Sequence, residues 1–199
     1  AIDILGIKKD GGFDYDFEKN ILRLIDTTDT VIREIPIDDH GRMYVNYYGP
    51  FQTYYYLPYM YCFDPEMLPP EYWEGKVAFV GASLPGLMDL RNTPVQETFA
   101  GVEIHANVMN SLLKGEFVQP KNRSQTFVII IIICVLLGVL VSLPEKPLYT
   151  LPVPLVGIVA WLLFTYSQFF SSLVMWEVVR PALAMISTYG GIFLYNFFI

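Results

Sequence analysis

Residues that could do chemistry gather between Ala78 and Leu113, in the stretch AFVGASLPGLMDLRNTPVQETFAGVEIHANVMNSLL. Ser83, Asp89 and His105 are the residue types of a nucleophilic triad, in which an acid orients a histidine that activates a hydroxyl. Asp89, Glu103 and His105 are also acid and imidazole donors of the kind that bind a divalent metal. The stretch therefore raises two hypotheses, a hydrolase site and a metal site.

The spacing argues against both hypotheses. Ser83 lies outside a Gly-x-Ser-x-Gly nucleophile elbow, and Ser, His and Asp occur together by chance in many stretches of this length. Residues two apart on a helix point about 200° from each other, so Glu103 and His105 cannot both reach one ion. Gly81 and Gly86 fit neither a dinucleotide-binding fingerprint nor a phosphate-binding loop. We therefore expect no catalytic residue, metal or cofactor site in this chain.

Structural roles suit these residues better. His105 shares a helical stripe with Met109 and Leu112, which predicts a half-buried imidazole that hydrogen-bonds the preceding loop. Asp89 suits the other end of that bond or a local loop cap, and Thr93 with the following proline stiffens the turn. Because a helix start leaves amides free for an anion, this region is a candidate ligand-input surface, formed by Asp89, Thr93, Glu103, His105 and Asn107.

A strand and a helix would position this surface. GKVAFVG, from Gly75 to Gly81, is a continuous apolar run, which is typical of a strand buried on both faces. The following GVEIHANVMNSLLKG predicts a helix that Gly115 ends. Its expected apolar face, which would cover the strand, contains Ile104, Val108, Met109 and Leu112, and its polar face contains Glu103, Asn107, Asn110 and Lys114. We therefore expect an α/β or α+β domain.

Three further elements are expected before residue 50. Apolar residues recur at helical spacing from Phe17 to Ile25, which predicts a short amphipathic helix over about residues 16–25. TVIREIPID and RMYVNYY have the β-branched and aromatic content of strands. The Asp-Asp-His-Gly sequence between them supplies a turn, so these two segments predict a β-hairpin.

Tyrosines are concentrated in one segment, since eight of the fourteen lie between Tyr44 and Tyr61. Tyrosine offers a large contact area with a polar tip, so this segment is a candidate ligand-stacking surface or partner interface. The residues proposed for that interface are Tyr54, Tyr55, Tyr56 and Tyr59. The alternative is that the same tyrosines form the edge of a core and pack near a membrane.

The composition divides the chain into two parts near Pro120. The hydrophobic fraction of 53% and the mean hydropathy of +0.39 are high for a soluble protein. Residues 1–120 hold 18 acidic and 9 basic residues, whereas only four charged residues lie in 124–199. The acidic part would be repelled by phosphates, so we expect no nucleic-acid partner.

The second part predicts three transmembrane helices, over about residues 125–143, 148–170 and 178–199. The first has 19 residues without a charge, and a helix of that length spans about 28 Å, the thickness of a bilayer core. Three crossings would place Ile199 on the opposite side of the bilayer from the polar domain. Lys121 and Arg123 would place that domain in the cytoplasm by the positive-inside rule, but long domains are translocated regardless of charge, so local charge leaves the side open.

The start of the chain and its two cysteines give little information about the cellular location or about disulfides. The first residues lack the basic-then-apolar pattern of a signal peptide, so an exported domain would need an anchor or signal before Ala1. Cys62 and Cys134 fall in different parts of the chain, so we expect no disulfide between them.

Two motifs point to a known family. The sequence GKVAFVGASLPGLMDLRNTPVQETFAGVEIHANVMNSLL resembles the C-terminal part of the second class of CHASE domain, whose pattern combines G-K-[IV]-V-x-[IV]-G-A-[ST]-x-x-G-x-x-D, T-P and P-G-V-E-I-H-A-N. RMYVNYYGPFQTY is similar to the strand that precedes it in that family, and three membrane helices follow such domains. Ala100 replaces the usual proline.

The resemblance implies a sensory role in bacteria. It places the polar domain in the periplasm or outside the cell, and a cytoplasmic output domain after the third helix, most often a class III adenylate or guanylate cyclase and less often a kinase. We expect no enzymatic activity in the present chain, because it contains none of those catalytic residues. The expected location is the inner membrane, and the expected partners are the lipid bilayer, a second copy or a larger complex, and an unknown small ligand or protein. The alternative is a non-signalling subunit that docks onto a membrane assembly.

Overall fold

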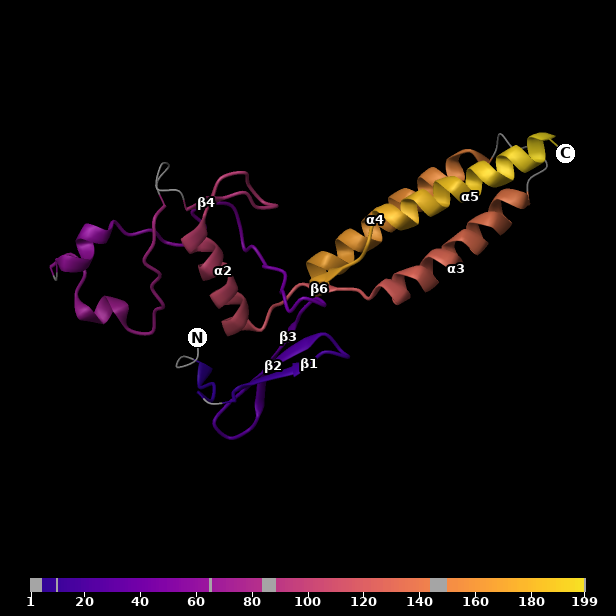
Figure 1. Cartoon of the computed structure of the whole chain (residues 1–199). Coiled ribbons are helices and arrows are strands. Elements are labelled where there is room, and N and C mark those ends of the chain that lie inside the picture. The colour runs from indigo at the N-terminus through magenta and orange to yellow at the C-terminus, as the bar shows by residue number, and fades with distance from the viewer. Residues whose placement is uncertain (1–4, 10, 65, 84–88, 144–149, 199) are drawn as a thin grey trace. The chain divides into compact units, whose positions relative to one another are not determined.

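The structure is a computed structural model that describes residues 5–9, 11–64, 66–83, 89–143 and 150–198. The chain divides into two compact units, Ala1–Phe117 and Val118–Ile199 (Figure 1). The first unit is a mixed α and β fold with small sheets, which confirms the mixed class expected from the sequence.

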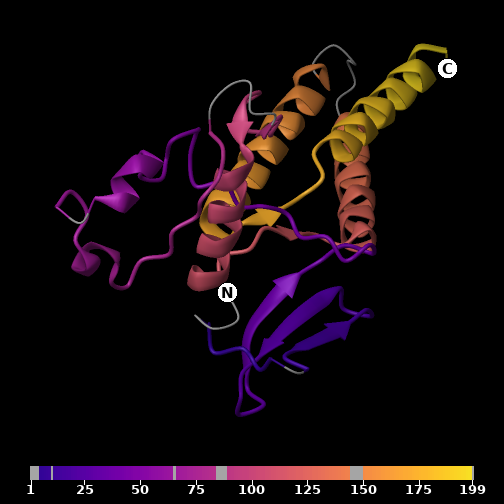
Figure 2. The ribbon, with the colours of Figure 1, turned by 60° about the vertical axis from the view of Figure 1, so that its left-hand side comes forward.

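An antiparallel three-stranded sheet begins the first unit. Its strands are β1 (Phe13–Asp16), β2 (Ile21–Ile25) and β3 (Val31–Pro36), with β2 in the centre (Figure 2). On one face, Arg23 of β2 forms ion pairs with Asp14, Asp16 and Glu34 at 2.9–3.1 Å. On the other face, buried side chains form the core of the unit, namely Ile7, Leu24, Ile35, Ile37 and Phe117.

The helix expected over residues 16–25 is wrong, because this segment is a turn followed by β2. Asn20 ends the turn with a φ of 55°, in the left-handed region that interrupts a helix. The alternation of β2 then buries Leu24 and directs Arg23 to the acidic residues of both neighbouring strands. A short run of apolar residues fits both the roughly 3.6-residue repeat of a helix and the two-residue repeat of a strand. Here the pairing of β2 with β1 and β3 makes the segment a strand.

The hairpin expected over residues 30–48 forms only in its first half. Strand β3 and the turn are present: Asp38 accepts hydrogen bonds from the amides of His40 and Arg42, and Gly41 has a φ of 74°. Residues 42–48 belong to no strand or ladder, which corrects the expected second strand. Their path is instead fixed by helix α2, to which the amide of Tyr48 donates a hydrogen bond.

GKVAFVG is not a buried strand. Residues 76–83 pair with no other strand of the described chain, and Val77, Phe79 and Val80 are exposed, Val80 by 76%. A β-strand needs a neighbour to satisfy its backbone groups, and no described segment supplies one. The segment nevertheless passes close to α2 (Gly101–Lys114), because a Cβ at Gly81 would lie 2.6 Å from the Cβ of Val102.

The described residues between 49 and 100 are mostly irregular. Two short 3-10 helices lie at Tyr59–Phe63 and Pro70–Trp73. Strands β4 (Leu90–Arg91) and β5 (Phe99–Ala100) form a two-residue ladder that leads directly into α2. Helix α2 ends at Gly115, with a φ of 73°, as predicted from the glycine.

Arg33 joins the sheet to helix α2. Its Nε donates to the carbonyl oxygen of Leu112 at 2.9 Å, and its Nη2 donates to that of Leu113 at 2.8 Å. The last carbonyls of a helix lack intrahelical partners and carry partial negative charge. A guanidinium donates hydrogen bonds to them and neutralises part of that charge. The side chain thus fixes β3 against the C-terminal end of a helix about 80 residues later in the sequence.

We expect Arg33→Met to lower the free energy of unfolding of the first unit by about 2 kcal/mol, because the two charge-assisted hydrogen bonds to α2 are lost while the apolar stem remains. A third hydrogen bond, from Nη1 to the Ile32 backbone oxygen, is lost as well. Urea denaturation followed by near-ultraviolet circular dichroism measures the change, and amide exchange should accelerate in the last turn of α2. Arg42→Met is the control: the Arg42 side chain is 73% exposed, and among the described residues its one ion pair is with Asp38, so a change below about 0.5 kcal/mol is expected. Equal effects of the two substitutions would contradict this role.

In the described part of the second unit there are three α-helices, α3 (Arg123–Ser142), α4 (Pro152–Ser172) and α5 (Val179–Phe198). Helices α3 and α5 run in one direction and α4 returns in the other (Figure 1). They pack through Leu137, Val141, Trp161 and Met185. A short parallel ladder between β6 (Gln119–Pro120) and β7 (Val174–Met175) joins the entrance of α3 to the connection between α4 and α5.

Two of these helices, α3 and α4, are long and apolar enough to cross a membrane. Helix α5 has similar length, but it contains Arg180 near its start and polar residues within it. The connection between α4 and α5 contains β7. Residues 174–178 run back along α4, since the Trp161 indole donates to the carbonyl oxygen of Glu177 at 3.2 Å. Helix α5 therefore begins beside the middle of α4.

Candidate functional site on helix α2

Three polar side chains of α2 are buried on one face of the helix. Glu103, Asn107 and Ser111 are exposed by only 2%, 1% and 0%, and their spacing of four residues places them in one line along the helix. No lysine or arginine of the described chain pairs with Glu103. A buried carboxylate without a cation requires several hydrogen-bond donors, and these come from the tyrosine-rich segment.

Glu103 binds a turn of backbone. Its Oε2 accepts hydrogen bonds from the amide of Gln52 at 3.0 Å and the hydroxyl of Tyr56 at 2.8 Å. Its Oε1 accepts from the amide of Thr53 at 3.0 Å and, more weakly, from that of Tyr54 at 3.5 Å. Gln52 has a φ of 69°, and such a left-handed residue turns successive amides toward one point. The segment thus forms a small anion-binding nest that the carboxylate fills.

Asn107 holds the same segment one helical turn later. Its Oδ1 accepts from the amide of Tyr48 at 3.0 Å and the hydroxyl of Tyr54 at 3.3 Å, while its Nδ2 donates to the backbone oxygen of Glu103 at 2.9 Å. Ser111 continues the line by donating to the backbone oxygen of Asn107 at 3.0 Å. We call Glu103, Asn107 and the segment 48–56 that they bind the clamp.

Aromatic rings cover the clamp. The ring of Phe99, which is fully buried, makes edge contacts with Tyr47 and Phe51 at centroid distances of 5.4 and 6.2 Å, and Phe51 contacts Tyr56 at 5.7 Å. Burial raises the pKa of the Tyr56 phenol, and its hydrogen bond to Glu103 raises that pKa further. The phenol therefore stays a neutral donor at physiological pH.

The four tyrosines proposed as an interface divide into two pairs. Tyr54 and Tyr56 are partly buried, and their hydroxyls are bound inside the clamp. Tyr55 and Tyr59 are exposed by 81% and 60%, and the Tyr59 ring contacts only Phe63 among the described aromatic rings. Only the second pair is available to a partner.

Asp89 and Thr93 shape the approach to α2. The amide of Gly101, the first helical residue, donates to the Asp89 backbone oxygen at 2.8 Å, and a Cβ at Gly101 would collide with the Asp89 carboxylate. Thr93 Oγ1 donates to the Gln96 backbone oxygen at 2.9 Å, which closes the turn between β4 and β5. The side chain of Gln96 then accepts from the amide of Phe51 at 3.2 Å, so this turn also supports the clamp.

His105 is exposed, so the half-buried imidazole expected from the sequence is wrong. The stripe of Glu103, Asn107 and Ser111 faces the interior instead, because the surface that α2 meets there is polar backbone. No hydrogen bond joins His105 to Ser83 or Asp89, and no group of three metal ligands occurs, within the part of the chain that the structure describes. The geometry around Glu103 and Asn107 holds the segment 48–56 in place.

Sequence reasoning missed Arg33 and Gln96, which act on partners distant in the chain and left no local signal. The polar stripe on α2 did leave a signal, since Glu103, Asn107 and Ser111 recur every four residues. This spacing predicts one polar line, but only the packing shows that the line is buried.

The clamp lies within a recognisable domain. A family model described as the CHASE2 domain matches residues 7–141, which is more than half of the chain. The chain belongs to the CHASE2 family. This confirms the resemblance read from the sequence. Neither a curated protein nor a solved structure shows significant similarity to the chain.

CHASE2 is an extracellular sensory domain of signalling proteins. The family match contains the sheet, the clamp and all of α2, and it continues through nearly all of α3. The clamp is therefore part of a sensory domain. The CHASE2 match extends into α3, the first of the two helices that could cross a membrane.

Proposed function

We propose that this chain is the sensory input and membrane-anchor region of a bacterial transmembrane signalling protein. The part of the CHASE2 domain that precedes α3 lies outside the inner membrane, and α3, α4 and α5 cross it. The observation that carries the proposal is the continuity of the family match from residue 7 to residue 141, which includes both the sheet with α2 and the apolar helix α3.

The helices support the membrane part of this proposal. The most apolar stretches of α3 and α4 have mean hydropathies of 2.8 and 1.6, and only 17% and 11% of their residues are buried. A soluble core helix with this composition would be mostly buried. Helix α5 is the third crossing, which places Phe198 opposite the CHASE2 domain.

Signalling requires two arrangements of the sensory domain that bind a ligand or partner with different affinity. The clamp is the input element in this proposal, because it fixes residues 48–56 on α2, and α2 leads through residues 115–122 to α3. A change at the clamp reaches the membrane through this connection. The output is a cytoplasmic enzyme, a class III adenylate or guanylate cyclase acting as a dimer.

A second candidate function, a docking subunit of a larger membrane assembly, is favoured by one observation. Large apolar side chains are exposed at the end of the clamp segment and just after it, namely Tyr55, Tyr59, Met60, Phe63 and Met67. Adding candidate ligands to the full-length protein in membranes separates the two functions, since only a sensor changes the activity of an attached enzyme.

The native cysteines allow a direct test of the topology. Cys62 is exposed in the CHASE2 domain, so in a Cys134→Ser chain a membrane-impermeant maleimide should label it in right-side-out vesicles and not in sealed inverted vesicles. Cys62→Ser in the same chain is the control. A cysteine placed at Phe198 in the cysteine-free chain should show the opposite pattern. Labelling of both positions from one side would contradict three crossings, and labelling of Cys62 only in inverted vesicles would reverse the orientation.

A further inference from the structure

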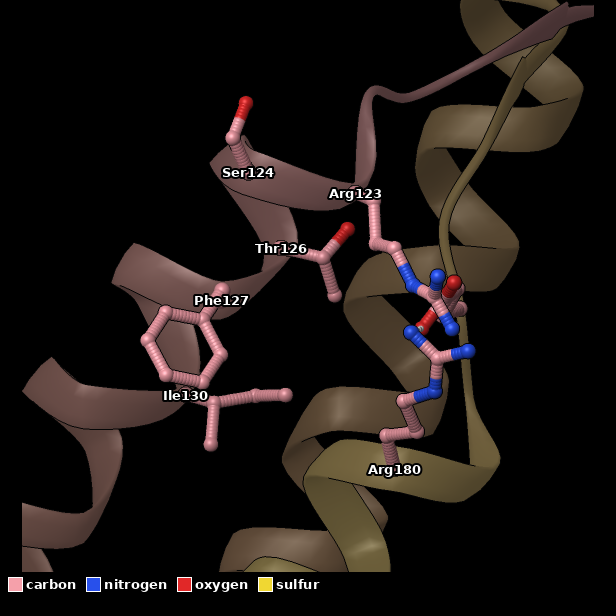
Figure 3. A pocket seen from close by; sticks show the side chains of 7 residues that line it. Arg123, Ser124, Thr126, Phe127, Ile130 and Arg180 are labelled. Atoms are coloured by element: carbon pink, nitrogen blue, oxygen red, sulfur yellow. Dashed lines mark ion pairs between the residues drawn. The ribbon is translucent and has the colours of Figure 1, made fainter.

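A cavity of about 300 Å³ lies where α3 and α5 begin. It is lined by Arg123, Ser124, Thr126, Phe127 and Ile130 from the start of α3, and by Glu177 and Arg180 from the entrance of α5. Figure 3 shows the guanidinium groups of Arg123 and Arg180 pointing toward each other from the two helices. The cavity is remote in sequence from the clamp.

The charges in the cavity leave one positive charge unbalanced. Arg180 Nη1 lies 3.1 Å from Glu177 Oε2 and neutralises it. Arg123 has no ion-pair partner among the described residues, and its side chain is exposed. A planar guanidinium binds phosphate oxygens through paired hydrogen bonds. The residual charge of one matches a phosphodiester, which carries a single negative charge.

The rest of the lining changes from polar to apolar along α3. Arg123 and Ser124 lie in its first turn, whereas Phe127 and Ile130 follow in the second and third turns (Figure 3). Phe127 is 63% exposed, and it continues into an exposed apolar surface formed by Val128, Ile131 and Ile132. A ligand that fits this gradient has an anionic head and an apolar tail.

We propose that this cavity binds the phosphodiester headgroup of a membrane phospholipid, with Arg123 and Arg180 on the phosphate and Phe127 and Ile130 against the acyl chains. The inference rests on the proposed function in one respect, since α3 must lie in a bilayer. It also accounts for basic residues at the end of α3 that the proposed topology places outside the cell, where the positive-inside rule disfavours them: their charge is matched by lipid phosphate.

The test uses the complete 199-residue chain in a neutral maltoside detergent, with phosphatidylglycerol as the probe. We expect native mass spectrometry to show that the protein retains phosphatidylglycerol saturably. We also expect the lipid to raise the midpoint of thermal unfolding of the protein. Arg123→Gln and Arg180→Gln should each weaken binding about tenfold. Glu177→Gln should tighten it several-fold, because it removes the opposing carboxylate. This variant keeps the test decisive if an arginine variant fails to fold.

Lys121→Gln is the matched control, because it removes a cation near the same helix end. The Lys121 ammonium lies 5.6 Å from the ring centroid of Trp176 and is not part of the cavity lining, so unchanged binding is expected. Equal binding of diacylglycerol, or equal binding by the folded double variant of Arg123 and Arg180, would overturn the phosphate site. Equal binding of glycerol 3-phosphate would show a soluble ligand instead of a lipid.

Extraction of membranes with alkaline carbonate separates this inference from the proposed function. A chain that stays in the membrane but shows no preference for phosphatidylglycerol refutes only the lipid site. A chain that carbonate removes refutes the membrane anchor itself.

Discussion

Asn107→Asp should lower the free energy of unfolding of the CHASE2 domain by about 4 kcal/mol, although the two side chains have the same shape. Asn107 is 1% exposed, and its Nδ2 donates to the backbone oxygen of Glu103. A carboxylate has no donor for that oxygen and adds a second buried negative charge one turn from Glu103. The loss should appear in urea denaturation as release of the segment 48–56.

The pH dependence of the stability of Asn107→Asp shows whether the loss comes from the added charge. Burial and the neighbouring carboxylate raise the pKa of the introduced acid in the folded state above its value in the unfolded state. The folded state then binds the proton more tightly, so the loss of stability relative to the native chain should shrink as the pH falls through the folded-state pKa. Asn122→Asp is the control, since Asn122 caps α3 by accepting from the Ser124 amide and aspartate caps equally well. A loss that does not change with pH would contradict the electrostatic explanation.

Glu103→Gln should lower the free energy of unfolding of the CHASE2 domain by about 3 kcal/mol. Both carboxylate oxygens of Glu103 accept hydrogen bonds, from the amides of Gln52 and Thr53 and from the Tyr56 hydroxyl. An amide keeps one acceptor and directs an NH₂ group at donors on the other side, so at least one buried donor is left unsatisfied. Amide exchange of residues 52–54 should accelerate in the variant.

His105→Gln is the control for Glu103, because His105 lies two residues later on the same helix and is exposed. Its expected effect is below about 0.5 kcal/mol. In the full-length protein, Glu103→Gln should also change the output activity without ligand if the clamp is the input element. A variant with unchanged stability and unchanged exchange would show that the clamp does not hold the segment 48–56.

Elements with local signals were predictable from the sequence. Helix α2 and its end at Gly115, the turn after Asp38, and the apolar character of α3 and α4 all follow from residues within a few positions of each other. The family pattern between Gly75 and Leu113 was likewise legible, and it identified the domain correctly. Such features depend on backbone preference and period, which short stretches of sequence contain.

Features that depend on distant partners were not predictable. The segment over residues 16–25 has a spacing that suits a helix, but backbone pairing of residues 21–25 with β1 and β3 makes that part a strand. GKVAFVG has the composition of a buried strand, yet no described strand lies beside it. The face that α2 buries was not predictable either. Burial of its polar stripe requires hydrogen-bond donors from a segment about 50 residues away in the sequence.

The family, the acidic and apolar parts of the chain, and the helices with a continuous period or apolar character can be read from the amino-acid sequence, because these properties are local. The burial of Glu103 and Asn107 and the exposure of His105 depend on the folded structure. The meeting of Arg123 and Arg180 at one cavity does so too. A side chain acquires its role from the groups that surround it, and hydrogen bonds and charge neutralisation act between atoms that the chain brings together only when it folds.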